Sequence, residues 1–262
     1  MKYIITESQY KTLMERKEQK ILHIPSVDYF GGREGLQQYL KKKGNPPYTL
    51  RDDLDLTDTN IKSLGNLISV EGNLNLKGTP IKSLGNLQSV GGSLSLYDTP
   101  IKSLGDLTKV GENLELNLSN LTSLENLISV GNSLFLAGSK IKTLGNLTSV
   151  GASLNIRNTK IESLGNLTKV GKNLDLGNTD LTSLENLISV GGNLDLSRTP
   201  IKSLGNLQSV GGNLDLSTTP IESLGNLQSV GGYLVLWQTP LSQKYTEEEI
   251  RSMVQVGGKI HF

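Results

Sequence analysis

The chain has 262 residues, no cysteine, 35% hydrophobic and 5% aromatic residues, and a formal net charge of +1 at pH 7. The lack of cysteine excludes disulfides and thiolate chemistry. A net charge near zero gives no overall field that would attract nucleic acid or an anionic membrane, and the hydrophobic share is low for a compact enzyme.

The first 49 residues predict an N-terminal helical cap. Thr6 and Gln9 match a capping box that opens a helix running to about Lys20. Residues 32–44, GREGLQQYLKKKG, predict a second helix that ends at a glycine. The opening sequence MKYIITESQY has an apolar run too short for a signal peptide or a membrane span, so we expect a soluble protein, with the cytoplasm favoured.

Nine consecutive units of twenty residues follow, from Leu54 to Tyr233. Every unit has six apolar columns, which in the second unit are Leu74, Leu76, Ile81, Leu84, Leu87 and Val90. The LxL pair puts two side chains on one face, as a short strand does. Glycine follows the valine in eight of the nine units, where a corner needs either a positive φ or a close backbone approach.

No unit is long enough for a stable helix, so each unit predicts one coil of a β-solenoid whose strands stack in parallel. The pattern starts at Leu50 and reaches Leu241. The fold class expected is therefore all-β with small helical caps: a parallel β-solenoid of about ten 20-residue coils over residues 50–241.

The repeat also resembles two known families. LxLxxTxIxSL resembles the leucine-rich-repeat signature, with Thr, or Ser at Ser119 and Ser139, in place of the usual Asn. SVGGNLDL followed by IKSLGNL resembles the repeat of the receptor L domain, and this resemblance implies a right-handed β-helix. Such families mostly bind proteins or glycans. The chain departs from the L-domain pattern in its lack of cysteine and its very uniform coils.

A weaker resemblance concerns the two ends. MKYIITESQY and YTEEEIRSMV resemble the ends of small repeat proteins of aquatic tailed phages, which implies a place in the host cytoplasm.

Residues 242–262 predict a C-terminal cap helix and a closing strand. Thr246 starts a short helix that carries Ile250, Met253 and Val254 on one face. The last residues, VGGKIHF, repeat the phrase VGGNLDL, so we expect Ile260 and Phe262 to finish the stack.

No catalytic or metal-binding constellation is present in the sequence. The two histidines, His23 and His261, belong to opposite caps, and no nucleotide-binding or zinc motif occurs. The aspartates at Asp175, Asp195 and Asp215 share a column, but any column of a solenoid has the spacing of a glycosidase pair, so that spacing carries no information. We therefore expect no enzyme, no cofactor and no metal.

Two polar columns suggest structural roles. An Asn column from Asn66 to Asn226 is expected to satisfy backbone groups in turns. A Thr/Ser column takes the position where leucine-rich repeats point a polar group inward, which disfavours ice binding. A lysine column is broken by Glu162 and Glu222, which disfavours a track for nucleic acid.

The LxL strand face is the part of the repeat that varies, as a recognition surface must, although exposed positions can also simply drift. We expect it to bind a macromolecule, most of all a protein, with the chain as a monomer. A basic partner segment would lie along the acidic column, near Arg157 and Arg198. The alternative is a glycan-binding or cell-surface adhesin, in which exposed aromatic side chains stack on sugars. The candidate binding residues are Asp175, Asp195, Asp215, Arg157, Arg198, Tyr97, Phe135, Tyr233 and Trp237.

Overall fold

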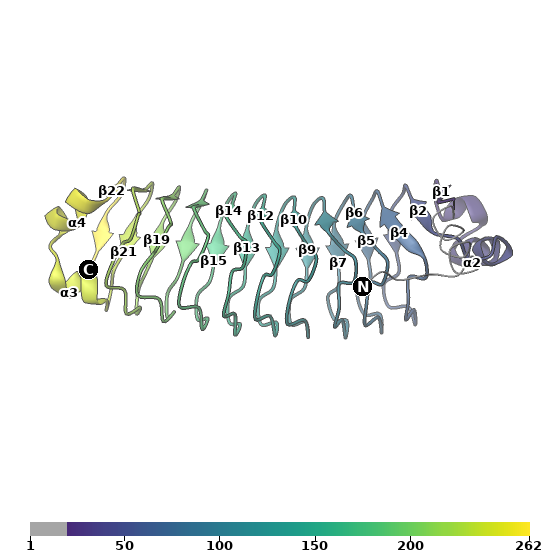
Figure 1. Ribbon diagram of the computed structural model, residues 1–262, viewed down its shortest axis with the longest axis horizontal. Coiled ribbons are helices and arrows are strands. Elements are labelled where there is room, and N and C mark those ends of the chain that lie inside the picture. Colours follow the sequence, from purple (N-terminus) through teal and green to yellow (C-terminus); the bar gives the residue numbers. More distant parts are fainter. Residues whose placement is uncertain (1–19) are drawn as a thin grey trace, which may run out of the picture.

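A computed structural model describes residues 20–262 of the chain. The helix expected from Thr6 lies outside these residues. The described chain forms a parallel β-solenoid, with coils stacked along the long axis and helices at both ends (Figure 1).

Two parallel sheets run along the solenoid, one of 12 strands, called sheet A, and one of 11, called sheet B. The strands of sheet A are β1 (Leu22–Ile24), β2 (Tyr48–Leu50), β4 (Leu67–Val70), β6 (Ser89–Val90), β8 (Lys109–Val110), β10 (Ser129–Val130), β12 (Ser149–Val150), β14 (Lys169–Val170), β16 (Ser189–Val190), β18 (Ser209–Val210), β20 (Ser229–Val230) and β22 (Gln255–Val256). The strands of sheet B are β3 (Leu54–Asp55), β5 (Leu74–Asn75), β7 (Leu94–Ser95), β9 (Leu114–Glu115), β11 (Leu134–Phe135), β13 (Leu154–Asn155), β15 (Leu174–Asp175), β17 (Leu194–Asp195), β19 (Leu214–Asp215), β21 (Leu234–Val235) and β23 (Ile260–His261).

The register confirms the twenty-residue coil. Leu134 pairs with Leu154 in sheet B, and Val130 pairs with Val150 in sheet A. The solenoid has about nine coils rather than the ten expected. The difference arises because the chain that leaves β21 turns into two helices before it returns to sheet A as β22, so the tenth coil is not a regular one.

The six apolar columns form one continuous core. Their side chains are buried in every repeat except at Ile61 of the first, which is partly buried, and most of them are buried completely. The Thr/Ser column is also buried from Thr79 to Thr239, as predicted: the Thr199 hydroxyl donates a hydrogen bond of 2.6 Å to the carbonyl of Leu196. Where serine replaces threonine, at Ser119 and Ser139, the buried hydroxyl has no hydrogen-bond partner among the described residues.

The glycine after each valine is required by close packing of backbone, the second of the two reasons considered. A Cβ atom on Gly131 would overlap the carbonyl oxygen of Gly111 in the preceding coil, and the same holds for Gly151 over Gly131. Positive φ angles occur elsewhere. They recur at two positions of the repeat. The first is the residue just before the Asn column. The second lies three residues after each strand of sheet B from β3 to β21, as at Thr218, where φ is 58°.

Thr218→Gly is expected to stabilise the protein. A β-branched residue in the left-handed region is strained, and glycine removes the strain at a cost in chain entropy, for a net gain of about 0.5–1 kcal/mol. Ser217→Gly is the matched control, because Ser217 does not have a positive φ and glycine there adds only entropy cost. Urea unfolding measures both variants. A loss of stability in Thr218→Gly would contradict the left-handed assignment.

The described part of the N-terminal cap, residues 20–49, contains strands as well as a helix. A 3₁₀ turn, η1 (Asp28–Phe30), leads to α2 (Arg33–Lys42), the second predicted helix, which buries Leu36 and Leu40. However, β1 and β2 pair in parallel and extend sheet A into this segment. These two strands, rather than α2, cover the first repeat of sheet A.

Two helices close the C-terminal end, α3 (Pro240–Lys244) and α4 (Glu247–Met253). The capping box of Thr246 and Glu249 is confirmed. Ile250 is buried, as expected of the apolar helix face, but Met253 is nearly half exposed because it ends the helix. Ile260 is buried on β23 and pairs with Leu234 at the end of sheet B, whereas Phe262 is nearly half exposed.

Arg251 of α4 closes the last coil of sheet A. Within the stack, the carbonyls of Val210 and Gly212 accept hydrogen bonds from glycine N–H groups of the next coil. The equivalent carbonyls at the end belong to Val256 and Gly258, and Arg251 donates to each of them at 2.9 Å. One guanidinium thus replaces two donors of a following coil.

Candidate interaction face

Sheet B presents the varied LxL face. Each of its strands places a leucine or isoleucine inward and the next residue outward. The register aligns Asp175 with Asp195 and Asp195 with Asp215, so the structure brings these three side chains into one line. We call these three residues the acidic row. All three are half-buried.

The carboxylates of the acidic row also have a structural role that sequence reasoning missed. Oδ1 of each aspartate accepts a hydrogen bond from the backbone N–H two residues later, at 3.0 Å for Asp175, 2.8 Å for Asp195 and 2.8 Å for Asp215. Asn75 and Asn155 accept the same bond in other coils. The signal was the recurrence of Asp or Asn in this column, since these residues often bond the backbone two residues on. These bonds fix the carboxylates in position.

The two arginines expected near the row differ in their placement. Nη1 of Arg157 lies 4.0 Å from Oδ2 of Asp175, and its side chain is about half exposed. Arg198 is exposed, has φ 57° and forms no ion pair among the described residues. The acidic row therefore has one cation at its first member and none in ion-pair contact with the other two within residues 20–262.

The pKa of the Asp175 carboxyl is raised above its ordinary value. Burial is the main cause, and the negative charge of Asp195 adds to it. The Gly177 N–H and the Arg157 charge act in the opposite direction and lower the pKa. Ionisation of Asp175 in the folded protein therefore costs free energy.

Asp175→Asn is expected to raise the melting temperature at pH 7. Because the folded-state pKa is raised, ionised Asp175 destabilises the fold above its unfolded pKa, and this penalty vanishes as pH falls below that value, about 3.9. Asparagine keeps the Oδ1 acceptor for Gly177, whereas the comparison variant Asp175→Ala loses it. Thermal melts from about pH 3 to pH 7 test this. A stability gain that is larger at pH 3 than at pH 7 would contradict the sign.

The four aromatic candidates do not form one site. Tyr97 and Trp237 are seven coils apart, about 34 Å at the spacing of parallel strands. Tyr97 lies beneath the Nζ atom of Lys77, at 5.6 Å from the ring centroid, and Phe135 is half-buried on β11.

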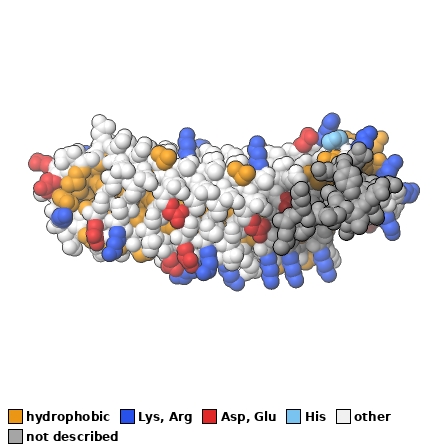
Figure 2. Space-filling view, in the orientation of Figure 1, with side chains coloured by type: hydrophobic (Ala, Val, Ile, Leu, Met, Phe, Trp, Pro, Cys, Tyr) orange, Lys and Arg blue, Asp and Glu red, His pale blue; other side chains and the backbone are white. Residues whose placement is uncertain are grey.

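Only Tyr233 and Trp237 lie together, Tyr233 just before β21 and Trp237 just after it. They are 48% and 54% exposed. Both rings meet the His261 ring edge to face, with centroids 5.6 and 6.0 Å apart. Hydrophobic side chains gather at this end of the solenoid, where α3 and α4 lie (Figure 2).

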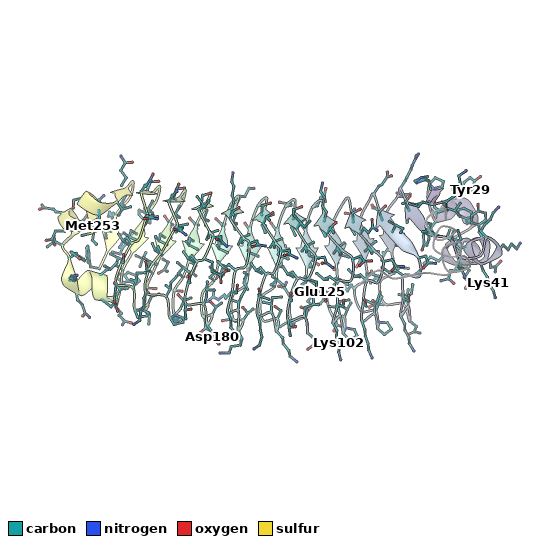
Figure 3. The ribbon with its side chains drawn as sticks, viewed as in Figure 1. Tyr29, Lys41, Lys102, Glu125, Asp180 and Met253 are labelled. Atoms are coloured by element: carbon teal, nitrogen blue, oxygen red, sulfur yellow. The ribbon has the colours of Figure 1, made fainter. Side chains whose placement is uncertain are left out.

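Another long edge carries the lysine column. Lys102 and Asp180 project from it (Figure 3), and basic side chains line its N-terminal half (Figure 2). The glutamates that break the column make ion pairs with lysines of the preceding coil. The pairs on this edge are Lys142–Glu162 at 3.0 Å, Lys160–Asp180 at 3.1 Å and Lys202–Glu222 at 3.8 Å. Such exposed pairs contribute little to stability.

Metal-binding clusters and membrane-spanning helices are absent from the described part of the chain. Residues 20–262 contain no group of three or more His, Asp or Glu side chains arranged to hold a metal ion. None of the helices in the same range is long and apolar enough to cross a bilayer.

Comparison with known proteins gives no family for this chain: no family model matches its sequence, and no curated protein does.

Proposed function

We propose that the protein is a non-enzymatic, monomeric scaffold that binds a protein partner through the LxL face, with a basic segment of the partner along the acidic row. One observation carries this proposal: three half-buried carboxylates stand in register, each fixed by a backbone N–H, and among the described residues only Asp175 has a cation within 4.0 Å.

The spacing of the row supports the choice of a cationic partner. Neighbouring carboxylates about 4.8 Å apart repel each other by roughly 1 kcal/mol in water. Cations of a partner remove this repulsion on binding. The flanking residues Gly177, Ser197 and Ser217 are small and leave the row accessible.

The rigidity of the scaffold supports the same function. Every coil hydrogen-bonds to the next through both sheets, so the positions of the carboxylates are set before a partner arrives. Preorganised groups lose little conformational entropy on binding. Complementary charge then acts mostly on the rate of association and on specificity.

The second candidate function is glycan or cell-surface adhesion. The observation that favours it is the exposed pair Tyr233 and Trp237, since aromatic rings stack on the apolar faces of sugars. Trp237→Ala separates the two candidates. It is expected to abolish glycan retention under the alternative, and to leave capture by the acidic row unchanged under the main proposal.

The resemblance to leucine-rich and L-domain repeats also supports a binding role. As part of the same proposal, the chain belongs to one of these families, originates in a tailed phage and acts in the host cytoplasm.

Capture of partners from host lysate tests the proposed function. The bait proteins are wild type and the triple variant Asp175→Asn/Asp195→Asn/Asp215→Asn, which removes three charges and keeps every Oδ1 acceptor. The matched control Glu162→Gln/Asp180→Asn/Glu222→Gln removes three charges from the lysine edge.

We expect a basic protein that wild type and the control retain and that the triple variant loses. Equal retention of the basic protein by all three baits would contradict the proposal.

A further inference from the structure

A groove runs beside sheet A, on a different surface from the LxL face. Two rows of exposed side chains line it: the Asn column from Asn126 to Asn226, and the residues two positions later in each coil, which are Thr, Ile or Gln. The structure has two stretches of this groove, of about 480 and 510 Å³, and they share Asn166. The groove is therefore continuous over several coils.

The hydrogen-bonding groups of the groove are only partly used. Nδ2 of Asn186 donates to the carbonyl of Gly165 at 3.0 Å, and Nδ2 of Asn146 donates to the carbonyl of Glu125 at 3.2 Å. Each of these amides keeps Oδ1 and a second N–H for a ligand, because one such bond uses one of its two N–H groups. The Thr168 hydroxyl likewise donates to the carbonyl of Thr148 and keeps its oxygen as an acceptor.

Apolar side chains recur in the second row with a longer period. Ile68, Ile128 and Ile188 are separated by sixty residues, which is three coils, or about 14 Å along the axis. Ile128 is 49% exposed and Ile188 is 43% exposed. Between these two residues the row holds only Thr148 and Thr168. The groove thus alternates apolar contacts with groups that donate and accept hydrogen bonds.

The groove is also uncharged. From Asn126 to Asn226 its lining residues are Asn, Thr, Ile and Gln, and only Asp106 at one end carries a charge. The lysine edge and the acidic row lie on other columns. A polyanion would find no cation among these lining residues, and a basic peptide would meet only Asp106 at one end.

We propose that this groove binds a linear, uncharged polysaccharide laid along the solenoid axis. Hydroxyl groups both donate and accept, so they match the asparagine amides of the groove and the threonine oxygen atoms at Thr148 and Thr168. The C–H faces of the sugar rings pack on the isoleucines. The groove is shallow and regular, and it offers no deep pocket for the varied side chains of a polypeptide.

This site does not depend on the proposed protein-binding function. It uses sheet A instead of the LxL face, so either proposal can fail while the other stands.

Titration calorimetry with neutral oligosaccharides tests the inference. The probes are cello-, manno- and chito-oligosaccharides of increasing length, and heparin is the charged comparison. At least one neutral series is expected to bind with an affinity that rises with chain length, because every coil crossed adds an asparagine amide and one further side chain of the second row. Heparin is expected to bind more weakly than that series.

The variants locate the site. Ile128→Lys/Ile188→Lys changes exposed side chains only, and is expected to weaken binding by about tenfold or more without lowering the melting temperature. Trp237→Ala and the triple Asp→Asn variant are expected to bind as wild type does. The inference is overturned if no neutral series binds at millimolar concentration, if affinity does not rise with length, or if the isoleucine variant binds as tightly as wild type. Loss of binding in Trp237→Ala would also overturn the inference, because it would show that the oligosaccharide binds at the aromatic end instead.

Discussion

Leu154→Asp is expected to unfold the centre of the solenoid. Leu154 is fully buried on β13, between Leu134 and Leu174 of the neighbouring coils. An aspartate there buries a carboxyl group with no partner, which costs several kcal/mol, about 4 or more. Because each coil contacts only its neighbours, the defect also divides the stack into two shorter parts.

Chemical denaturation followed by circular dichroism measures this effect. Asn155→Ser is the matched control, since Asn155 points outward and a serine hydroxyl can accept the hydrogen bond from the N–H of Arg157 without adding a carboxylate beside Asp175. The control is expected to change stability by no more than about 0.5 kcal/mol. If Leu154→Asp unfolded at the same denaturant concentration as wild type, Leu154 would not be inward and the register would be wrong.

Gly131→Ala is expected to have the second largest effect. The added Cβ would overlap the carbonyl oxygen of Gly111, which is backbone and has no rotamer by which to move away. The two coils must separate locally, which weakens the hydrogen bonds of sheet A and the core beneath. We expect a loss of about 3 kcal/mol, at the upper end of the range for overpacking.

The neighbouring residue provides the control. Asn132→Ala is expected to be mild, because the next coil already has Ala152 at the equivalent position. Thermal melts of both variants give the comparison. Equal melting temperatures for Gly131→Ala and wild type would show that the coils do not approach as closely as the structure has them.

The fold could be predicted well because each core position recurs in nine repeats. The apolar columns set the register, and the buried threonines were expected from their position in the LxL phrase. The glycine after each valine was less certain, since a positive φ and a close approach both require glycine. The distance between stacked coils shows that close approach is the reason. That distance cannot be deduced from the sequence of one coil.

The caps were harder to predict because they occur once. The strand β1 is three residues long and pairs with β2 across the 3₁₀ turn and α2, and no repeat marks it. The bonds of Arg251 to Val256 and Gly258 also depend on how α4 folds back over the last coil. Such long-range contacts leave no periodic signal.

The candidate site was predicted in part. The register alone put the three aspartates in one line, and counting coils would have separated Tyr97 from Trp237. The half-burial of the row could not be predicted, because it depends on side chains of neighbouring coils. The same applies to the contact of His261 with both aromatic rings.

The most direct test of the acidic row is the rate of association with the captured partner, measured over a salt series for wild type and for the triple Asp→Asn variant. Attraction between exposed charges is screened over about 10 Å at 0.1 M salt, so it acts on the rate most strongly when salt is low. We predict that the wild-type rate falls steeply with salt, and that the variant is slower at low salt with a flatter dependence. Superimposable rates for the two proteins across the series would contradict the account.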